Sequence, residues 1–280
     1  MSILSQMSGA QPLDFSKSKS EDEVHPSFRI SALKPMSPTM YEMVIEFDRD
    51  ISSKVKPGKY LKFDALGESV YLSINDQLTS TQLRFIIGGA SLSKFQSRLL
   101  DYLYYLFMDK VEVVEYSIEG TALGRMVGKH QILAIATGTG ITYANSIVLN
   151  HVFGSQELVK QSPDADHPSI DLIWACNNPS LMPQSRVFTY LKSTSPEGLF
   201  NYYPLIQGYE PHQQVIVDRE GITQQGLLAF IDERYAGQDL NKHIIYIGSN
   251  PEYTGIIAKH LIENFNANPV MIVSDNFKGV

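Results

Sequence analysis

Residues 134–146 read AIATGTGITYANS, an apolar run followed by a Gly-Thr-Gly turn and the start of a helical pattern. Gly138 and Gly140 lack Cβ atoms, so the backbone there can adopt positive φ and approach a ligand closely. A helix that begins near Thr142 would direct free N–H groups and a positive dipole end at an anion such as pyrophosphate. The turn lacks the third glycine of the dinucleotide fingerprint and the Gly-Lys-Ser/Thr of a P-loop. A ligand site and a plain tight turn therefore both stay open.

The sequence from about residue 128 onward alternates short apolar runs with amphipathic segments. This alternation is typical of a parallel sheet that helices cover on both faces. Ligands of such sheets bind beyond the carboxyl ends of the strands. The loops at these ends are ATGTG (136–140), ACNN (175–178) and GSNPE (248–252). The expected strands cover residues 130–137, 169–176, 202–210, 242–249 and 270–277, and the expected helices cover residues 143–153, 182–193, 223–235 and 253–265.

Residues 28–127 have the alternating pattern of short β-strands, with one helical segment inserted late. In the segment 91–107, Phe95, Leu99, Leu103 and Leu106 recur at helical spacing, and Ser91 or Ser93 can cap the start. The pattern predicts an N-terminal antiparallel Greek-key barrel, followed by a parallel-sheet nucleotide-binding α/β domain at 128–280. Residues 1–27 are polar and aperiodic, which predicts a flexible N-terminal lead. The expected barrel strands cover residues 28–36, 40–48, 56–65, 69–76, 83–89 and 110–120.

Composition excludes several classes of function. The net charge of −7 and the absence of a dense Lys/Arg stripe argue against nucleic acid as a partner. A single cysteine, Cys176, excludes an intrachain disulfide and a multi-cysteine metal site, and the scattered histidines predict no metal site. Neither a membrane-spanning stretch nor a signal-peptide pattern is present. We therefore expect a cytoplasmic protein with no membrane span.

Five motifs in order give the chain a family resemblance over about residues 28–280. They are KPGKYL (56–61), IIGGASLSKFQSRLL (86–100), IATGTGITYANSIVL (135–149), IYIGSNPEYTGIIAKHL (245–261) and SDNFKGV (274–280). This series resembles the ferredoxin-reductase superfamily, and within it the bacterial NAD(P)H:flavin oxidoreductases of the luciferase-associated type. In that family flavin lies between the barrel and the α/β domain, and NAD(P)H delivers hydride to flavin N5. The cofactors supply this chemistry, so no acid–base pair is required.

The resemblance implies the residues that would bind the cofactors. Ser73 is expected to orient the flavin ring as the catalytic residue, and the cofactors are FMN or riboflavin, weakly held, with NADH or NADPH. A protein electron acceptor is a further expected partner. The expected cofactor-binding residues are Tyr71, Leu72, Ser73, Gly138, Thr139, Gly140, Ile141, Thr142, Asn177, Asn178, Gly248, Ser249, Asn250, Pro251 and Phe277.

Three arginine positions of the resembled family are lost in this chain. Val70 replaces the Arg of the Arg-x-x-Ser flavin strand, which removes a contact worth about 1.5–3 kcal/mol. Asn177 stands at the Arg of a Gly-Gly-Arg loop and cannot neutralise a 2′-phosphate. Asn250 replaces the Arg of a later Gly-Arg loop. These losses favour weak flavin binding, and they keep a second hypothesis open: a catalytically degenerate relative that acts as a binding or regulatory module.

Other residues near these motifs also have ordinary structural interpretations. Cys176 can touch a nicotinamide or be a buried structural thiol. Trp174 is expected in the core of a strand. Lys94 and Arg98 can hold a phosphate or be solvated charges at the start of their helix. Tyr143 can stack on a ring or simply pack.

Overall fold

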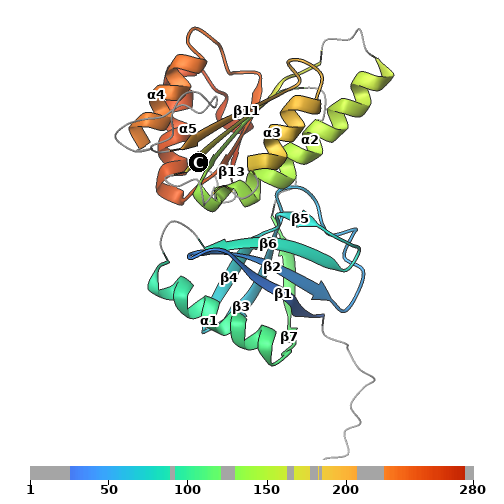
Figure 1. Ribbon diagram of the computed structural model, residues 1–280. Helices are drawn as coiled ribbons and strands as arrows, with labels where there is room; N and C mark the ends of the chain where they lie inside the picture. Colours follow the sequence, from blue (N-terminus) through green and yellow to red (C-terminus); the bar gives the residue numbers. More distant parts are fainter. Residues whose placement is uncertain are drawn as a thin grey trace, which may run out of the picture.

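Figure 1 shows a computed structural model of the chain, in which an N-terminal part rich in antiparallel strands lies beside a C-terminal α/β part. The structure describes residues 26–88, 92–120, 130–162, 167–176, 182, 185–206 and 224–274. Residues 1–25, most of the expected N-terminal lead, lie outside these ranges. So do the expected boundary at 127 and 128 and the predicted site residues Asn177, Asn178 and Phe277.

The N-terminal part comprises the elements from β1 to β8, whose described strands form two antiparallel sheets. Their strand orders are β5-β6-β2-β1-β7 and β4-β3-β8. The sheets enclose a shared core, in which Phe63 and Val70 of one sheet pack with Phe28, Met43 and Phe85 of the other. The elements are β1 (Ser27–Ser37), β2 (Met40–Phe47), β3 (Tyr60–Ala65), β4 (Glu68–Ser73), β5 (Asp76–Gln77), β6 (Gln82–Gly88), α1 (Lys94–Met108), β7 (Val113–Val114) and β8 (Tyr116–Glu119).

Helix α1 begins where the sequence predicts a capped start. Ser93 Oγ accepts a hydrogen bond from the Gln96 N–H at 3.1 Å, and Gln96 Oε1 accepts from the Ser93 N–H at 2.8 Å, which forms a capping box. Leu99, Leu103 and Leu106 are buried against the core of the N-terminal part, which confirms the predicted apolar face. The other expected cap, residue 91, lies outside the described residues.

The α/β part contains a parallel sheet with the strand order β11-β10-β9-β12-β13. Along β9, Ile132 and Ala134 face the helices α2 and α3, whereas Leu133 and Ile135 face α4 and α5. This alternation buries both faces of the sheet. The elements are β9 (Gln131–Thr137), the 3₁₀ turn η2 (Gly138–Gly140), α2 (Ile141–Gln161), β10 (Ile170–Cys176), α3 (Ser185–Thr194), β11 (Phe200–Ile206), α4 (Gln224–Arg234), β12 (His243–Gly248), α5 (Pro251–Phe265), the 3₁₀ turn η5 (Pro269–Met271) and β13 (Ile272–Ser274).

The strand order places a topological switch point between β9 and β12. The chain leaves β9 toward β10 on one side, and it later returns to add β12 on the other side. Helices that leave neighbouring strands on opposite faces of the sheet open a crevice beyond the strand ends, which is where ligands of such sheets bind. The Gly-Thr-Gly turn follows β9, and GSNPE follows β12, so both predicted loops meet at this crevice.

Among the described helices, none combines the length and the apolar character that a bilayer span requires.

Candidate functional site

A pocket of about 760 Å³ lies between the N-terminal part and the carboxyl ends of the parallel strands. One wall comes from β4, β6 and α1, and the other from the carboxyl ends of β9 and β10 and from the residues that follow β9 and β12. The volume falls within the range of small-molecule and cofactor sites. The chain thus brings together two segments far apart in sequence, the end of β4 and the Gly-Thr-Gly turn.

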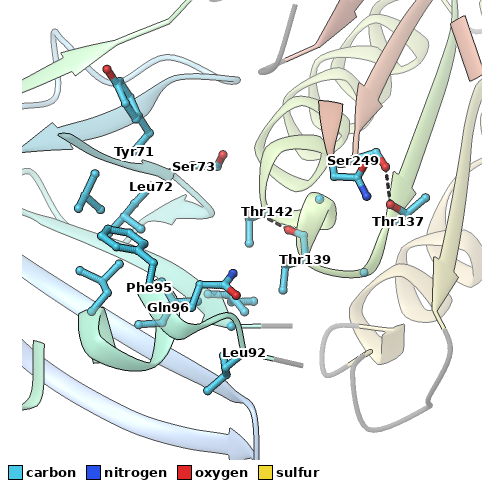
Figure 2. A pocket seen from close by; sticks show the side chains of 18 of the residues that line it. Tyr71, Leu72, Ser73, Leu92, Phe95, Gln96, Thr137, Thr139, Thr142 and Ser249 are labelled. Atoms are coloured by element: carbon cyan, nitrogen blue, oxygen red, sulfur yellow. Dashed lines mark hydrogen bonds between the residues drawn. The ribbon is translucent and has the colours of Figure 1, made fainter. Parts of the chain in front are cut away.

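The wall from the N-terminal part is mainly apolar. Leu92, Phe95 and Leu99 contribute from α1 and the residues before it, and Ile86 and Leu72 contribute from the strands. Figure 2 shows the Phe95 ring beside Leu72, with Gln96 at the edge of this surface. Such a surface offers a flat aromatic ligand a face for dispersion contacts.

Strand β4 supplies the residues expected to meet a flavin ring. Its alternation places Val70 in the core of the N-terminal part, whereas the Tyr71 side chain is 56 % exposed. The Tyr71 ring makes an edge-on contact with Tyr60, with 5.6 Å between the ring centroids. In Figure 2 Ser73 lies nearer than Tyr71 to the side of the pocket where Thr142 lies. Ser73 is thus a polar lining residue at the end of β4.

The Gly-Thr-Gly turn forms the opposite wall and is held by side chains. Trp174 Nε1 donates a hydrogen bond of 2.9 Å to the carbonyl oxygen of Gly138, and Thr142 Oγ1 donates one of 2.9 Å to the carbonyl oxygen of Thr139. Trp174 is fully buried on β10, as the sequence predicts. The sequence reasoning missed its role in supporting the turn, because a strand residue and a turn 36 positions away are joined by the parallel pairing of β9 and β10.

Gly140 and Gly248 allow the two loops of the switch point to touch. A Cβ atom on Gly140 would lie 1.9 Å from the Gly248 carbonyl oxygen, and one on Gly248 would lie 2.1 Å from the Gly140 carbonyl oxygen. No side chain fits at these distances. The main reason for glycine at these two predicted site positions is therefore the packing of backbone against backbone.

Two hydroxyls and a helix cap complete the second wall. Thr137 Oγ1 and Ser249 Oγ are 2.6 Å apart and share a hydrogen bond, as Figure 2 shows. Asn250 caps helix α5, since its Oδ1 accepts a hydrogen bond of 2.9 Å from the Tyr253 N–H, and Pro251 is the first helical residue. Asn250, which stands at a lost arginine position, thus has a structural role as a cap. The N-terminal ends of α2 and α5 both border the pocket.

The described residues that line the pocket include no charged side chain. Among these lining residues, an anionic group would meet hydroxyls and N–H dipoles, but no lysine or arginine side chain. Ionic contacts to phosphate are stronger than neutral hydrogen bonds. The polar lining residues are Ser69, Tyr71, Ser73, Gln96, Thr137, Thr139, Thr142, Ser249, Asn250 and Tyr253, together with Cys176.

Cys176 ends β10 at the edge of this pocket. Its side chain is buried, and burial raises the pKa of the thiol to about 12. The thiol therefore stays protonated near neutral pH, and the residue is a weak candidate for a nucleophile. The described residues contain no group of three or more His, Cys, Asp or Glu side chains that could hold a metal ion.

The structure brings most of the described site residues together. Ile141 and Gly248 are buried and do not line the pocket. Lys94 and Arg98 are exposed on α1 and are also absent from the lining. The sequence did not indicate that Leu92, Phe95 and Gln96 line the pocket. The apolar stripe of α1 predicted only that this helix packs against a core. The predicted residues that line the pocket are Tyr71, Leu72, Ser73, Gly138, Thr139, Gly140, Thr142, Ser249, Asn250 and Pro251.

No protein-family model matches the chain, and no curated protein matches it.

Solved structures of other proteins share the architecture. The flavohem-like FAD/NAD binding domain of nitric oxide dioxygenase from Vibrio cholerae O1 biovar El Tor matches with a TM-score of 0.61 and 15% identity, over 90% of this chain and 98% of that chain. A ferredoxin NADP+ reductase from Neisseria gonorrhoeae matches with a TM-score of 0.60 and 15% identity, over 91% of this chain and 100% of that chain. The cytochrome b5 reductase domain of Ulva prolifera nitrate reductase matches with a TM-score of 0.60 and 14% identity, over 89% and 96%.

At these identities the likeness shows the fold. Antiparallel sheets followed by a parallel-sheet α/β part form the ferredoxin-reductase type of architecture, which confirms the predicted fold class. The luciferase-associated subgroup stays a prediction.

Proposed function

We propose that the protein is an NAD(P)H-dependent oxidoreductase of the flavin reductase type, which reduces loosely bound FMN or riboflavin in the cytoplasm. The observation that carries this proposal is the pocket itself, because it joins the end of β4 to the Gly-Thr-Gly turn and the start of α5. The solved structures with this fold include one with bound FAD and NADP. A protein electron acceptor of the reduced flavin is part of the proposal.

The residues fit the ring of a flavin better than its phosphates. The apolar surface of Leu72, Phe95 and Leu99 suits a flat aromatic system, and Ser73 offers one hydroxyl beside it. The described lining offers no cation for a phosphate, and Val70, at the expected arginine position, is buried in the core of the N-terminal part. This combination supports a flavin held mainly by its ring.

In this proposal the bound cofactors supply the redox chemistry, as hydride passes from a reduced nicotinamide to a flavin ring. The protein orients the two rings against each other and excludes water. Ser73 would donate a hydrogen bond to a bound flavin ring, while Thr139 and the N–H groups at the start of α2 would bind the nucleotide. The turn is positioned for this task by the hydrogen bond from Trp174 to Gly138.

Mixing the purified protein with NADH or NADPH and with riboflavin or FMN tests the proposal. We expect the absorbance of the reduced nicotinamide to fall faster than in a mixture without protein. Ser73→Ala should slow the reaction, and Ser31→Ala, which removes an exposed hydroxyl on β1 that is not part of the pocket lining, should leave it unchanged. No oxidation of either nucleotide above background would refute the proposal.

The second candidate function is a binding or regulatory module that has lost catalysis. The absence of charged side chains in the described lining favours it, because phosphate-bearing cofactors would bind there weakly. A ligand present at 100 times its dissociation constant adds about 2.7 kcal/mol of stability. Thermal unfolding that responds to neither flavin nor NADH would support this candidate, and stabilisation by either would count against it.

A further inference from the structure

The first turns of α2 are buried on every side. Ile141 to Asn145 are five consecutive buried residues, although a helix at a protein surface normally exposes one face. Figure 1 shows this end of α2 at the junction of the two parts of the molecule. The helix therefore packs on its own sheet and on the N-terminal part at once, and its side chains can set the distance between them.

Two hydrogen bonds join this end of α2 to the N-terminal part. Asn145 Nδ2 donates to the carbonyl oxygen of Asn75 at 2.9 Å, and the Gly58 N–H donates to Ser146 Oγ at 3.1 Å. Asn75 and Asn145 are almost fully buried. Asparagine is a poor helix former, so its burial inside a helix needs a partner such as this carbonyl group.

Both contacts lie at the open end of the β3–β4 hairpin. Gly58 precedes β3 by two residues, and Asn75 follows β4 by two residues. Within the hairpin Tyr60 pairs with Ser73, and the Ile74 N–H donates to the Lys59 carbonyl oxygen at 3.1 Å. Helix α2 thus holds both strands at the end where Ser73 enters the pocket.

The fit at Gly58 restricts how the hairpin can sit on the helix. A Cβ atom there would lie 3.1 Å from Ile147 Cδ1 and 3.4 Å from the Tyr143 ring, and the residue has a φ of +78°. The turn therefore rests directly on α2, and the positive φ together with these close contacts favours glycine at this position. The other end of the same helical segment is the Gly-Thr-Gly turn on the opposite wall of the pocket.

From this arrangement we infer that Asn145 and Ser146 are positioning residues that hold the β4 wall of the pocket in register with the Gly-Thr-Gly wall. They act through the backbone of Asn75 and Gly58 and do not line the pocket. The link to catalysis rests on the proposed function, whereas the link to the geometry of the hairpin does not.

Hydrogen exchange tests the geometric part without any ligand. The variants are Asn145→Leu, which keeps the shape and removes the donor, Ser146→Ala, and the double variant. We expect the amides of residues 58–75 to exchange roughly three- to tenfold faster in each single variant, as for the loss of one net hydrogen bond, and faster again in the double variant, with β1 and β2 unchanged. The matched control is Ser195→Ala, which removes a hydrogen bond of α2 away from the hairpin, the one that Ser195 Oγ accepts from Gln156 Nε2 at 3.1 Å. Unchanged exchange in 58–75, or a uniform rise over the whole chain, would overturn the inference.

Steady-state kinetics tests the functional part. The KM for NADH should stay within about twofold of the wild-type value, while kcat/KM for riboflavin should fall about tenfold in the double variant, because one wall moves relative to the other. Ser146→Thr keeps the hydroxyl and should restore the value of the wild type. If the KM for NADH changed as much as the kcat/KM for riboflavin, or if threonine did not restore the wild-type value, the two residues would have a merely structural role. A wild-type protein without activity would refute the proposed function and leave the exchange result to decide the inference.

Discussion

At the scale of single residues, the pocket depends on groups whose importance comes from what lies beside them. Gly140 and Gly248 share a backbone contact that leaves no room for a methyl group. Gly138 has a positive φ of 52°, but a Cβ atom there would meet nothing within 4 Å. The two glycines of this turn are therefore needed for different reasons: Gly140 for close backbone packing, and Gly138 for its backbone conformation.

This difference predicts different effects for two similar substitutions. Gly138→Ala should lower the free energy of unfolding by about 1 kcal/mol, since it adds only the strain of a left-handed alanine. Gly140→Ala should cost about 3 kcal/mol or more, because the loops after β9 and β12 must separate. Urea unfolding followed by the fluorescence of the single tryptophan measures both. Equal losses would show that the two loops can separate freely.

A buried histidine gives the fold a sensitivity to acid. His151 is buried on α2, and its Nε2 lies 3.1 Å from the Tyr246 hydroxyl. Burial lowers the pKa of His151 from 6.5 to about 4. Between pH 6.5 and about pH 4, His151 is therefore protonated in the unfolded chain but neutral in the folded chain. The free energy of unfolding is consequently highest at neutral pH and decreases as the pH falls through this range.

Because of His151, we expect the free energy of unfolding to be about 2 kcal/mol lower at pH 5 than at pH 7. Urea unfolding at both pH values, on the wild type and on His151→Gln, isolates this contribution, because glutamine keeps a polar group and does not titrate. The variant should lose less stability than the wild type over that interval. Equal losses in the two proteins would exclude His151 as the cause.

At the scale of elements, the sequence predicts what local periodicity controls. The capping box of α1 and its apolar stripe follow from residues at fixed spacing, and the strands of the parallel sheet follow from apolar runs between helices. The division of the N-terminal strands into two ladders depends on pairing between distant segments. Likewise, the contact of Phe95 with the pocket depends on where α1 docks, which spacing within the helix does not specify.

The polar network around Asp171 stabilises the end of the sheet far from the pocket. Asp171 lies near the start of β10, and its carboxylate accepts hydrogen bonds from the Tyr235 hydroxyl at 2.6 Å and from Asn201 Nδ2 at 2.8 Å. Cys176, at the opposite end of the same strand, reaches the pocket. One strand thus separates a structural site from the candidate functional site.

Tyr235→Phe should therefore reduce stability without changing ligand binding. Removal of the hydroxyl leaves a buried carboxylate short of one donor, and we expect a loss of about 1–3 kcal/mol in the free energy of unfolding. Riboflavin affinity, measured by fluorescence titration, should match that of the wild type. A change in affinity with unchanged stability would mean that the network reaches the pocket.

At the scale of the whole molecule, the order of motifs predicts the fold and the two loops of the switch point. The sequence does not predict the character of the pocket, because its walls come from segments that only tertiary packing brings together. The loss of arginine at Val70 and Asn250 is visible in the sequence, but the absence of any charged side chain from the described lining is a property of the assembled site. That property determines which part of a ligand the protein can hold.

A pocket whose described lining carries no charge should bind flavins with little dependence on salt or on their phosphates. We expect riboflavin and FMN to bind with Kd values within about threefold of each other, because a missing ionic contact removes the advantage of the phosphate. Raising the salt from about 0.05 to about 0.5 M should change either Kd by less than about twofold, since screening acts on charge pairs. The purified protein should accordingly be colourless. Tight, salt-sensitive binding of FMN, or a yellow protein, would contradict this expectation.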